Sequence, residues 1–159
     1  MGILIRISRR LAALYLLVAL SILARADEIA PLTDSEVRAV LDHGSPGVFY
    51  AWSPHMPLSV DGLTEILAAG EHLDLAVIPV LSSHANVGYA RDRIEGRELP
   101  ETVLRQSESG ELIKNDLFVH APAILIFDGG EFVSPVLPGF RYADDYEQLI
   151  GRFLQSAKE

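Results

Sequence analysis

The most reactive side chains of this sequence lie in one short stretch, FYAWSPHMPLS, at residues 49–59. A run of aromatic and apolar residues ends there at Trp52, the only Trp of the chain, and the tetrapeptide SPHM follows at residues 53–56. A hydroxyl, an imidazole and a thioether within four residues could serve nucleophilic catalysis or bind a soft metal ion. The stretch is therefore the first candidate for a functional site.

The chain contains no cysteine, which excludes one large class of chemistry. Thiol-disulfide exchange needs a thiolate that attacks a sulfur atom. The hydroxyl of Ser53 is too weakly acidic to replace a thiolate, and the thioether of Met56 cannot form a disulfide. The sequence thus predicts a protein without thiol-disulfide oxidoreductase activity, disulfide bonds or cysteine metal ligands.

A serine hydrolase is a second possibility, because Ser53 and His55 are two residues apart. A nucleophilic serine needs a base within hydrogen-bond reach, an orienting acid and an oxyanion hole. Ser53 has no surrounding GxSxG motif, the usual setting of such a serine in α/β-hydrolases. Hydrolysis is therefore not the expected activity, and no catalytic residue is predicted.

Residues 1–26 have the pattern of a secretory signal peptide. Three arginines precede an apolar run over residues 11–23, and Ala24-Arg25-Ala26 provides an A-x-A cleavage site. The run of 13 residues is shorter than the roughly 20 needed for a membrane-spanning helix. We expect cleavage and a soluble domain at 27–159 in the periplasm. An uncleaved segment would instead anchor the protein to the inner membrane, with the domain facing the periplasm.

The net charge of the chain limits the classes of partner that it is expected to bind. Without residues 1–26, the domain has nine Lys plus Arg against 22 Asp plus Glu, which gives a net charge of about −13. This negative field disfavours nucleic acids and anionic lipid surfaces and favours basic partners.

Hydrophobic periodicity in the domain predicts alternating helices and strands. Thr33 and Glu36 form a capping-box pattern at the start of the first helix, and Ser59 is the expected N-cap of the second. The predicted helices span residues 34–43, 60–72, 86–95, 100–106 and 144–156, and the predicted strands span 48–52, 75–81, 122–128 and 131–137.

This order of elements resembles the thioredoxin fold, and three landmarks support the resemblance. The strand ending in FYAW leads into SPHM, which stands where disulfide oxidoreductases of the DsbA type carry CPHC. Pro122 is similar in position to the cis proline of the family, and Gly139 matches a glycine that precedes the last helix. The resemblance implies an α/β, three-layer α/β/α sandwich with a mixed four-stranded sheet and a helical insertion before the cis-Pro strand.

In redox members of this fold, the loop and the cis proline grip a polypeptide. The resemblance therefore implies that a cysteine-free member acts by binding, as a periplasmic accessory or assembly factor for another exported protein or peptide. The expected binding residues are those of the loop and the cis-Pro edge, namely Trp52, Ser53, Pro54, His55, Met56, Ala121 and Pro122.

An alternative function is copper binding or copper delivery. His55 and His84 each follow a predicted strand, and His120 precedes an antiparallel one, so all three are expected at the same edge of the sheet. Imidazoles together with the thioether of Met56 suit copper better than magnesium or calcium. The competing interpretation is that these histidines are separate surface residues, in which case no cofactor is needed.

Overall fold

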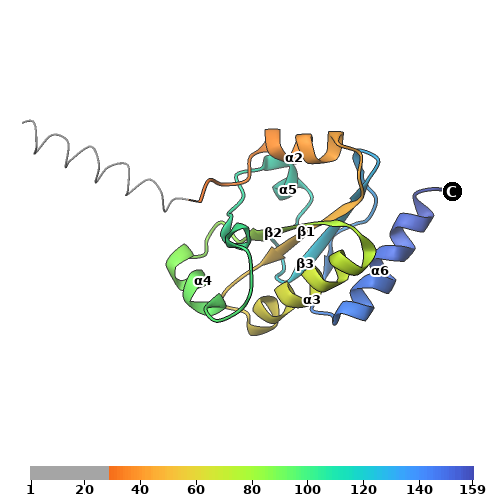
Figure 1. The fold of residues 1–159 in the computed structure, drawn as a ribbon. Coiled ribbons are helices and arrows are strands. Elements are labelled where there is room, and N and C mark those ends of the chain that lie inside the picture. Colours follow the sequence, from red (N-terminus) through yellow and green to blue (C-terminus); the bar gives the residue numbers. More distant parts are fainter. Residues whose placement is uncertain (1–28) are drawn as a thin grey trace, which may run out of the picture.

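The computed structural model describes residues 29–159. The predicted signal segment, residues 1–26, lies outside this range. Within residues 29–159, no helix is long and apolar enough to cross a membrane. The described chain forms a central sheet with helices on both faces, as predicted (Figure 1).

Strand β1 (Gly47–Trp52) lies at the centre of the sheet and is buried along its whole length. It pairs in parallel with β2 (Ala76–Leu81) on one side and antiparallel with β3 (Ala123–Asp128) on the other. Its six consecutive apolar or aromatic residues fit a strand that is covered on both faces. The three strands lie close to the predicted boundaries.

The fourth position of the sheet is occupied by two short strands instead of one. Both β4 (Glu131–Phe132) and β5 (Leu137–Pro138) pair with β3, which gives five strands in total. Between them, the hydroxyl of Ser134 accepts a hydrogen bond of 3.0 Å from the N–H of Ile126 and replaces a missing strand partner. Pro135 has no N–H to donate, which explains why the predicted continuous strand over 131–137 is interrupted.

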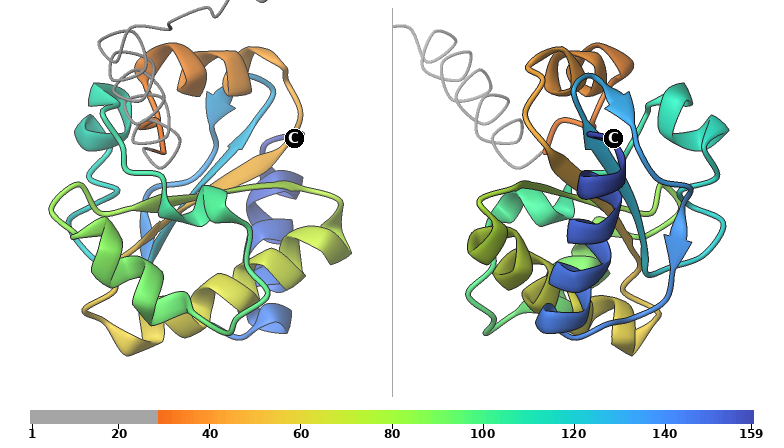
Figure 2. Two further views of the ribbon diagram at one scale, coloured as in Figure 1. Left: turned by 60° about the vertical axis from the view of Figure 1, so that its left-hand side comes forward. Right: turned by 90° about the vertical axis from the view of Figure 1, so that its right-hand side faces the viewer.

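Helices cover the two faces of the sheet unequally (Figures 1 and 2). The side chains of Val48, Tyr50 and Trp52 belong to one core cluster, and those of Phe49 and Ala51 belong to the other. The first cluster is covered by α3 (Pro57–Leu73), α4 (Val87–Ile94), the 3-10 helix η1 (Glu101–Leu104) and α6 (Ala143–Ser156), and the second by α2 (Asp34–Asp42) and α5 (Gly110–Lys114).

Two helix predictions need correction. Helix α3 starts at Pro57, three residues earlier than expected, so Ser59 lies inside the helix and Met56 is the N-cap. Proline at the first helical position needs no hydrogen-bonded N–H, which allows the early start. The helix predicted over 100–106 is only the four-residue η1, because the chain beyond it joins the sheet.

This addition extends the sheet beyond β2. The N–H of Leu81 donates to the carbonyl of Arg105 at 2.7 Å, and the N–H of Leu32 donates to the carbonyl of Gln106 at 2.7 Å. The guanidinium of Arg105 then donates to the Ala30 and Pro31 carbonyls and to the Glu36 carboxylate. Residues 29–32, which we call the N-terminal segment, are thereby held along the edge of the sheet through Ala30, Pro31 and Leu32.

The space beside Gly62 in α3 generates the first prediction. A Cβ atom at Gly62 would collide with the buried hydroxyl of Tyr50, whereas a Cβ at Gly151 in α6 would meet nothing. We expect Gly62→Ala to lower the free energy of unfolding by about 1–3 kcal/mol through overpacking. Gly151→Ala is the matched control and should raise it by about 0.5–1 kcal/mol. Denaturant titration measures both, and equal effects would contradict the packing argument.

The carboxylate of Glu36 generates a prediction about pH. Hydrogen bonds from the Thr33 N–H and from Arg105 lower the pKa of Glu36 from 4.5 to about 2. Its stabilising contribution is therefore complete above about pH 5 and is lost as the pH falls toward 2. Glu36→Gln should reduce the free energy of unfolding at pH 7 and reduce it less at pH 3. Glu98→Gln, at an exposed glutamate, is the control, and a pH-independent effect of Glu36→Gln would contradict the assignment.

Candidate functional site

The SPHM loop connects the end of β1 to the start of α3 and is held in a defined turn. The N–H of Met56 donates to the carbonyl of Ser53 at 3.2 Å. The N–H of Ser53 donates to the hydroxyl of Ser59 at 2.9 Å, and Ser59 is fully buried. The hydroxyl of Tyr50 donates to the carbonyl of Ser59 at 2.9 Å. The loop is therefore anchored from below by a serine that the sequence had suggested only as a helix cap.

Burial keeps the hydroxyl of Tyr50, which supports Ser59, protonated. Desolvation raises the pKa of Tyr50, with a further contribution from Tyr146, whose ring lies edge-on at a centroid distance of 6.4 Å. Tyr50 thus remains a neutral hydrogen-bond donor to the Ser59 carbonyl.

Trp52 lies beneath the loop rather than on its surface. Its side chain is fully buried, and its indole N–H donates to the carbonyl of Val103 at 2.7 Å. Pro54 is also buried. Of the predicted loop residues, His55 and Met56 are exposed and Ser53 is half-buried. Trp52 and Pro54 therefore shape the loop, and the other three are accessible to a partner.

The predicted cis proline is present, because the Ala121–Pro122 peptide bond is cis. Ala51 pairs with Ala123, so the register places Pro122 beside the last residue of β1, next to the SPHM loop. The carbonyl of Pro122 accepts a hydrogen bond of 2.8 Å from Gly139. Within residues 29–159, no hydrogen bond involves the backbone of Ala121. The loop and a free backbone segment therefore share one edge.

Apolar side chains that the sequence analysis did not select are exposed around the N-terminus of α3. Met56 and Leu58 are 49% and 55% exposed, and Tyr142 is 65% exposed. The rings of Tyr142 and Phe140 lie edge-on at 5.1 Å, and Phe140 packs near Gly62, one turn after Leu58. We call Met56, Leu58, Phe140 and Tyr142 the apolar edge. Local sequence gives no signal for it, because Phe140, on which Tyr142 packs, reaches α3 only through the tertiary fold.

The three candidate copper-binding histidines have different surroundings in the structure. His55 stacks on Tyr89 of α4, with ring centroids 5.0 Å apart and planes at 25°. His84 is exposed after β2, and His120 borders a groove of about 560 Å³ beside β5. In the described part of the chain, no three or more His, Cys, Asp or Glu side chains are grouped to hold a metal ion. Copper binding stays a prediction for which this geometry offers no ready ligand set.

The hydroxyl of Ser53 is not activated by His55 in this structure. It accepts a hydrogen bond of 3.4 Å from the backbone N–H of His55, while the imidazole stacks on Tyr89. A serine nucleophile needs the imidazole itself as its base. In this structure the Ser53 hydroxyl therefore lacks the His55 base that acyl transfer by this pair would need.

Comparisons with known proteins agree with this architecture. No protein-family model matches the chain, and no curated protein matches its sequence. Among solved structures, MTB dsbF is similar with 18% identity and a TM-score of 0.54, covering 69% of this chain and 81% of its own. A thioredoxin-family thiol:disulfide interchange protein from Chlorobium tepidum is similar with 15% identity and a TM-score of 0.54, and the match covers 73% of this chain and 83% of that protein. The N-terminal domain of PilB from N. meningitidis is similar with 17% identity and a TM-score of 0.50, and the match covers 71% of this chain and 84% of that domain.

The chain therefore has the thioredoxin-like fold, with the mixed sheet, the cis proline and the flanking helices in the expected places. It is a cysteine-free version of that fold, with Ser53 and Met56 at the two ends of the loop tetrapeptide. At these identities, the similarity concerns the fold alone.

The anchor beneath the loop generates the next prediction. Ser59→Ala removes the acceptor of the Ser53 N–H, which is half-buried, and should lower the free energy of unfolding by about 1 kcal/mol. Ser156→Ala is the control, since the Ser156 hydroxyl bonds only to an exposed carbonyl at the end of α6. It should change stability by less than about 0.5 kcal/mol. Hydrogen exchange of the Ser53 amide should accelerate only in Ser59→Ala, and unchanged exchange would contradict this role.

Proposed function

We propose that this protein is exported and binds an extended segment of another exported polypeptide at the cis-Pro edge, without enzymatic chemistry. The observation that carries the proposal is the free backbone of Ala121 beside exposed apolar side chains at the start of α3. A partner strand needs unpaired backbone groups for affinity and neighbouring side chains for specificity. Both are present at one edge.

The alternation of hydrogen bonds along β3 shows which residues of this strand direct their backbone groups toward β1. The N–H and carbonyl of Ile126 bond toward Ser134 and Val133, on the side away from β1. Residues of opposite parity, including Ala123, therefore face β1. Ala121 lies before β3, in a bend and across the cis peptide bond, so this alternation does not extend to it, and the N–H of Ser53 after β1 is already taken by Ser59. Because no hydrogen bond within residues 29–159 involves the backbone of Ala121, a partner backbone could pair with its N–H and carbonyl.

The apolar edge gives this site its side-chain contacts. Met56 is flexible and polarisable, so it adapts to different apolar surfaces. Tyr142 offers a large ring with a polar tip, a residue type that is enriched at interfaces. Two acidic residues, Asp144 and Asp145, follow in the first turn of α6. We therefore propose a partner segment with apolar residues and nearby basic charge.

Export is supported by the sequence pattern of residues 1–26, with its arginines, apolar run and A-x-A site. We propose that the segment is cleaved and that the domain functions in the periplasm. Intact mass of the protein recovered from a periplasmic fraction distinguishes a chain that starts at Asp27 from one that keeps its membrane-anchoring segment.

Paired charge substitutions test the binding proposal. Leu58→Glu places a carboxylate in the apolar edge, and Ile113→Glu is its control, because Ile113 is similarly exposed at 57% but lies in α5. We expect the wild type and Ile113→Glu to retain the same periplasmic proteins on an affinity column. Leu58→Glu should reduce their amounts at least about fivefold, equivalent to about 1 kcal/mol of lost binding. Quantitative mass spectrometry gives the readout.

The position of the bound segment is tested separately. A photo-crosslinking residue at position 58 should attach to an extended segment of the retained protein, and the same residue at position 113 should not. Protection of the Ala121 amide from hydrogen exchange in the complex would support strand addition. Equal retention by both Glu variants, or equal cross-linking from both positions, would refute the proposal.

A further inference from the structure

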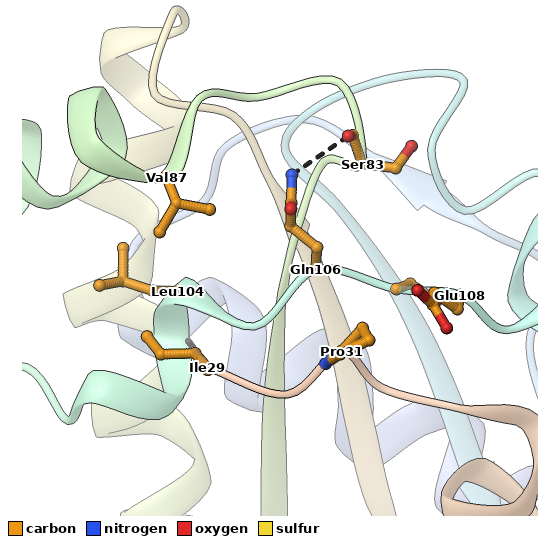
Figure 3. A pocket seen from close by; sticks show the side chains of 8 residues that line it. Ile29, Pro31, Ser83, Val87, Leu104, Gln106 and Glu108 are labelled. Atoms are coloured by element: carbon orange, nitrogen blue, oxygen red, sulfur yellow. Dashed lines mark hydrogen bonds between the residues drawn. The ribbon is translucent and has the colours of Figure 1, made fainter. Parts of the chain in front are cut away.

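A separate cavity lies at the opposite side of β2 from β1, where the N-terminal segment meets the loop after β2 (Figure 3). Its volume is about 400 Å³, within the range of roughly 300–1,000 Å³ that is usual for small-molecule sites. None of its lining residues belongs to the apolar edge or the SPHM loop. The cavity is lined by Ile29, Pro31, Ser83, Val87, Leu104, Gln106, Ser107 and Glu108.

One wall of the cavity is apolar. Ile29, Val87 and Leu104 come from the N-terminal segment, α4 and η1, and Figure 3 shows their side chains on the same side. Leu104 is 2% exposed and belongs to the core, so this wall is fixed by the fold. Such a surface favours an alkyl or similar apolar group.

The opposite wall contains Gln106, whose orientation is set by three carbonyl groups. Its side-chain nitrogen donates to the carbonyls of Ser82, Ser83 and Ala85 at 3.1, 3.1 and 2.9 Å. An amide oxygen could not replace the nitrogen there, because it would face three other acceptors. The Gln106 Oε1 atom is thereby directed away from those carbonyls, and no donor reaches it within residues 29–159.

The only charged side chain among the described residues that line the cavity is negative. Glu108, an exposed residue on the chain just after Gln106, contributes a carboxylate to the lining, and no Lys, Arg or His is among the described lining residues. The nearby Arg105 cannot neutralise it without leaving its own partners, the Glu36 carboxylate at 2.8 Å and the carbonyls of Ala30 and Pro31. Glu108 makes no ion pair with any described residue. The polar wall therefore offers acceptors, two hydroxyls and a negative charge.

We propose that this cavity binds a small amphiphile with a primary ammonium group and a short apolar portion. The ammonium group supplies the donors that Gln106 and Glu108 lack, and the apolar portion covers Ile29 and Val87. A carboxylate or phosphate group in the same place would meet the Glu108 charge without a compensating cation. This site is independent of the proposed polypeptide-binding edge.

Titration with three probes of equal chain length tests the charge preference. Hexylammonium, 1-hexanol and hexanoate are added to the ¹⁵N-labelled full chain, after its N-terminus has been determined by intact mass. We expect hexylammonium to shift the signals of the Gln106 side-chain amide and of the Ser83 and Val87 backbone amides. Binding of 1-hexanol should be about fivefold weaker, a factor typical of one lost charge-assisted hydrogen bond at a partly open site, and hexanoate should not bind.

Two variants locate the site. Glu108→Gln should weaken hexylammonium binding about fivefold and leave 1-hexanol binding unchanged, because it removes only the charge. Glu98→Gln is the matched control at an exposed glutamate outside the cavity and should leave both unchanged. Val87→Trp, at a half-buried surface position, should fill the cavity and abolish binding of both probes while the remaining amide signals stay dispersed.

The proposal fails if the three probes bind equally, if hexylammonium shifts no signal of the cavity, or if Glu108→Gln and Glu98→Gln behave alike. Loss of the polypeptide partners in Leu58→Glu would not affect these results, because Leu58 does not line the cavity.

Discussion

The two-sided pairing of β1 determines where every feature of the site lies. Its parallel register with β2 and its antiparallel register with β3 bring the end of β1 and the start of β3 to one edge of the sheet. All six residues of β1 are buried, so a shift of one residue would move its side chains to the wrong face of a two-sided core. The register of β1 therefore places the SPHM loop beside Pro122, and this placement does not depend on the side chains of the loop.

The loop keeps its shape without the sulfur chemistry usually associated with it. Ser59 and Tyr50 secure the turn from below, and Trp52 fills the space beneath it with a hydrogen bond to the chain after α4. None of these contacts involves position 53 or 56 through its side chain. These three hydrogen bonds that hold the loop therefore do not depend on the side chains at positions 53 and 56.

The segment after η1 gives the fold its second distinctive region. It extends the sheet beyond β2, holds the N-terminal segment through Arg105, and fixes the loop after β2 through Gln106 (Figure 3). The contact of Arg105 with Ala30 joins parts of the chain 75 residues apart, and those of Gln106 with the loop after β2 join parts 21 to 24 residues apart. The cavity is lined by Gln106 and Ser107 of this segment, which form isolated bridges to Leu81 and Leu32 instead of the helix that the sequence suggested.

The sequence by itself determined the order of elements, the SPHM loop, the position of Pro122 and the absence of cysteine. These features depend on local periodicity, composition and residue identity, which a single sequence displays. Only the tertiary structure decided that Ser59 anchors the loop, that Phe140 lies beside Gly62 of α3, and that Gln106 and Ser107 form bridges to Leu81 and Leu32. Long-range hydrogen bonds and packing decide such features, and they override local propensity without leaving a periodic signal.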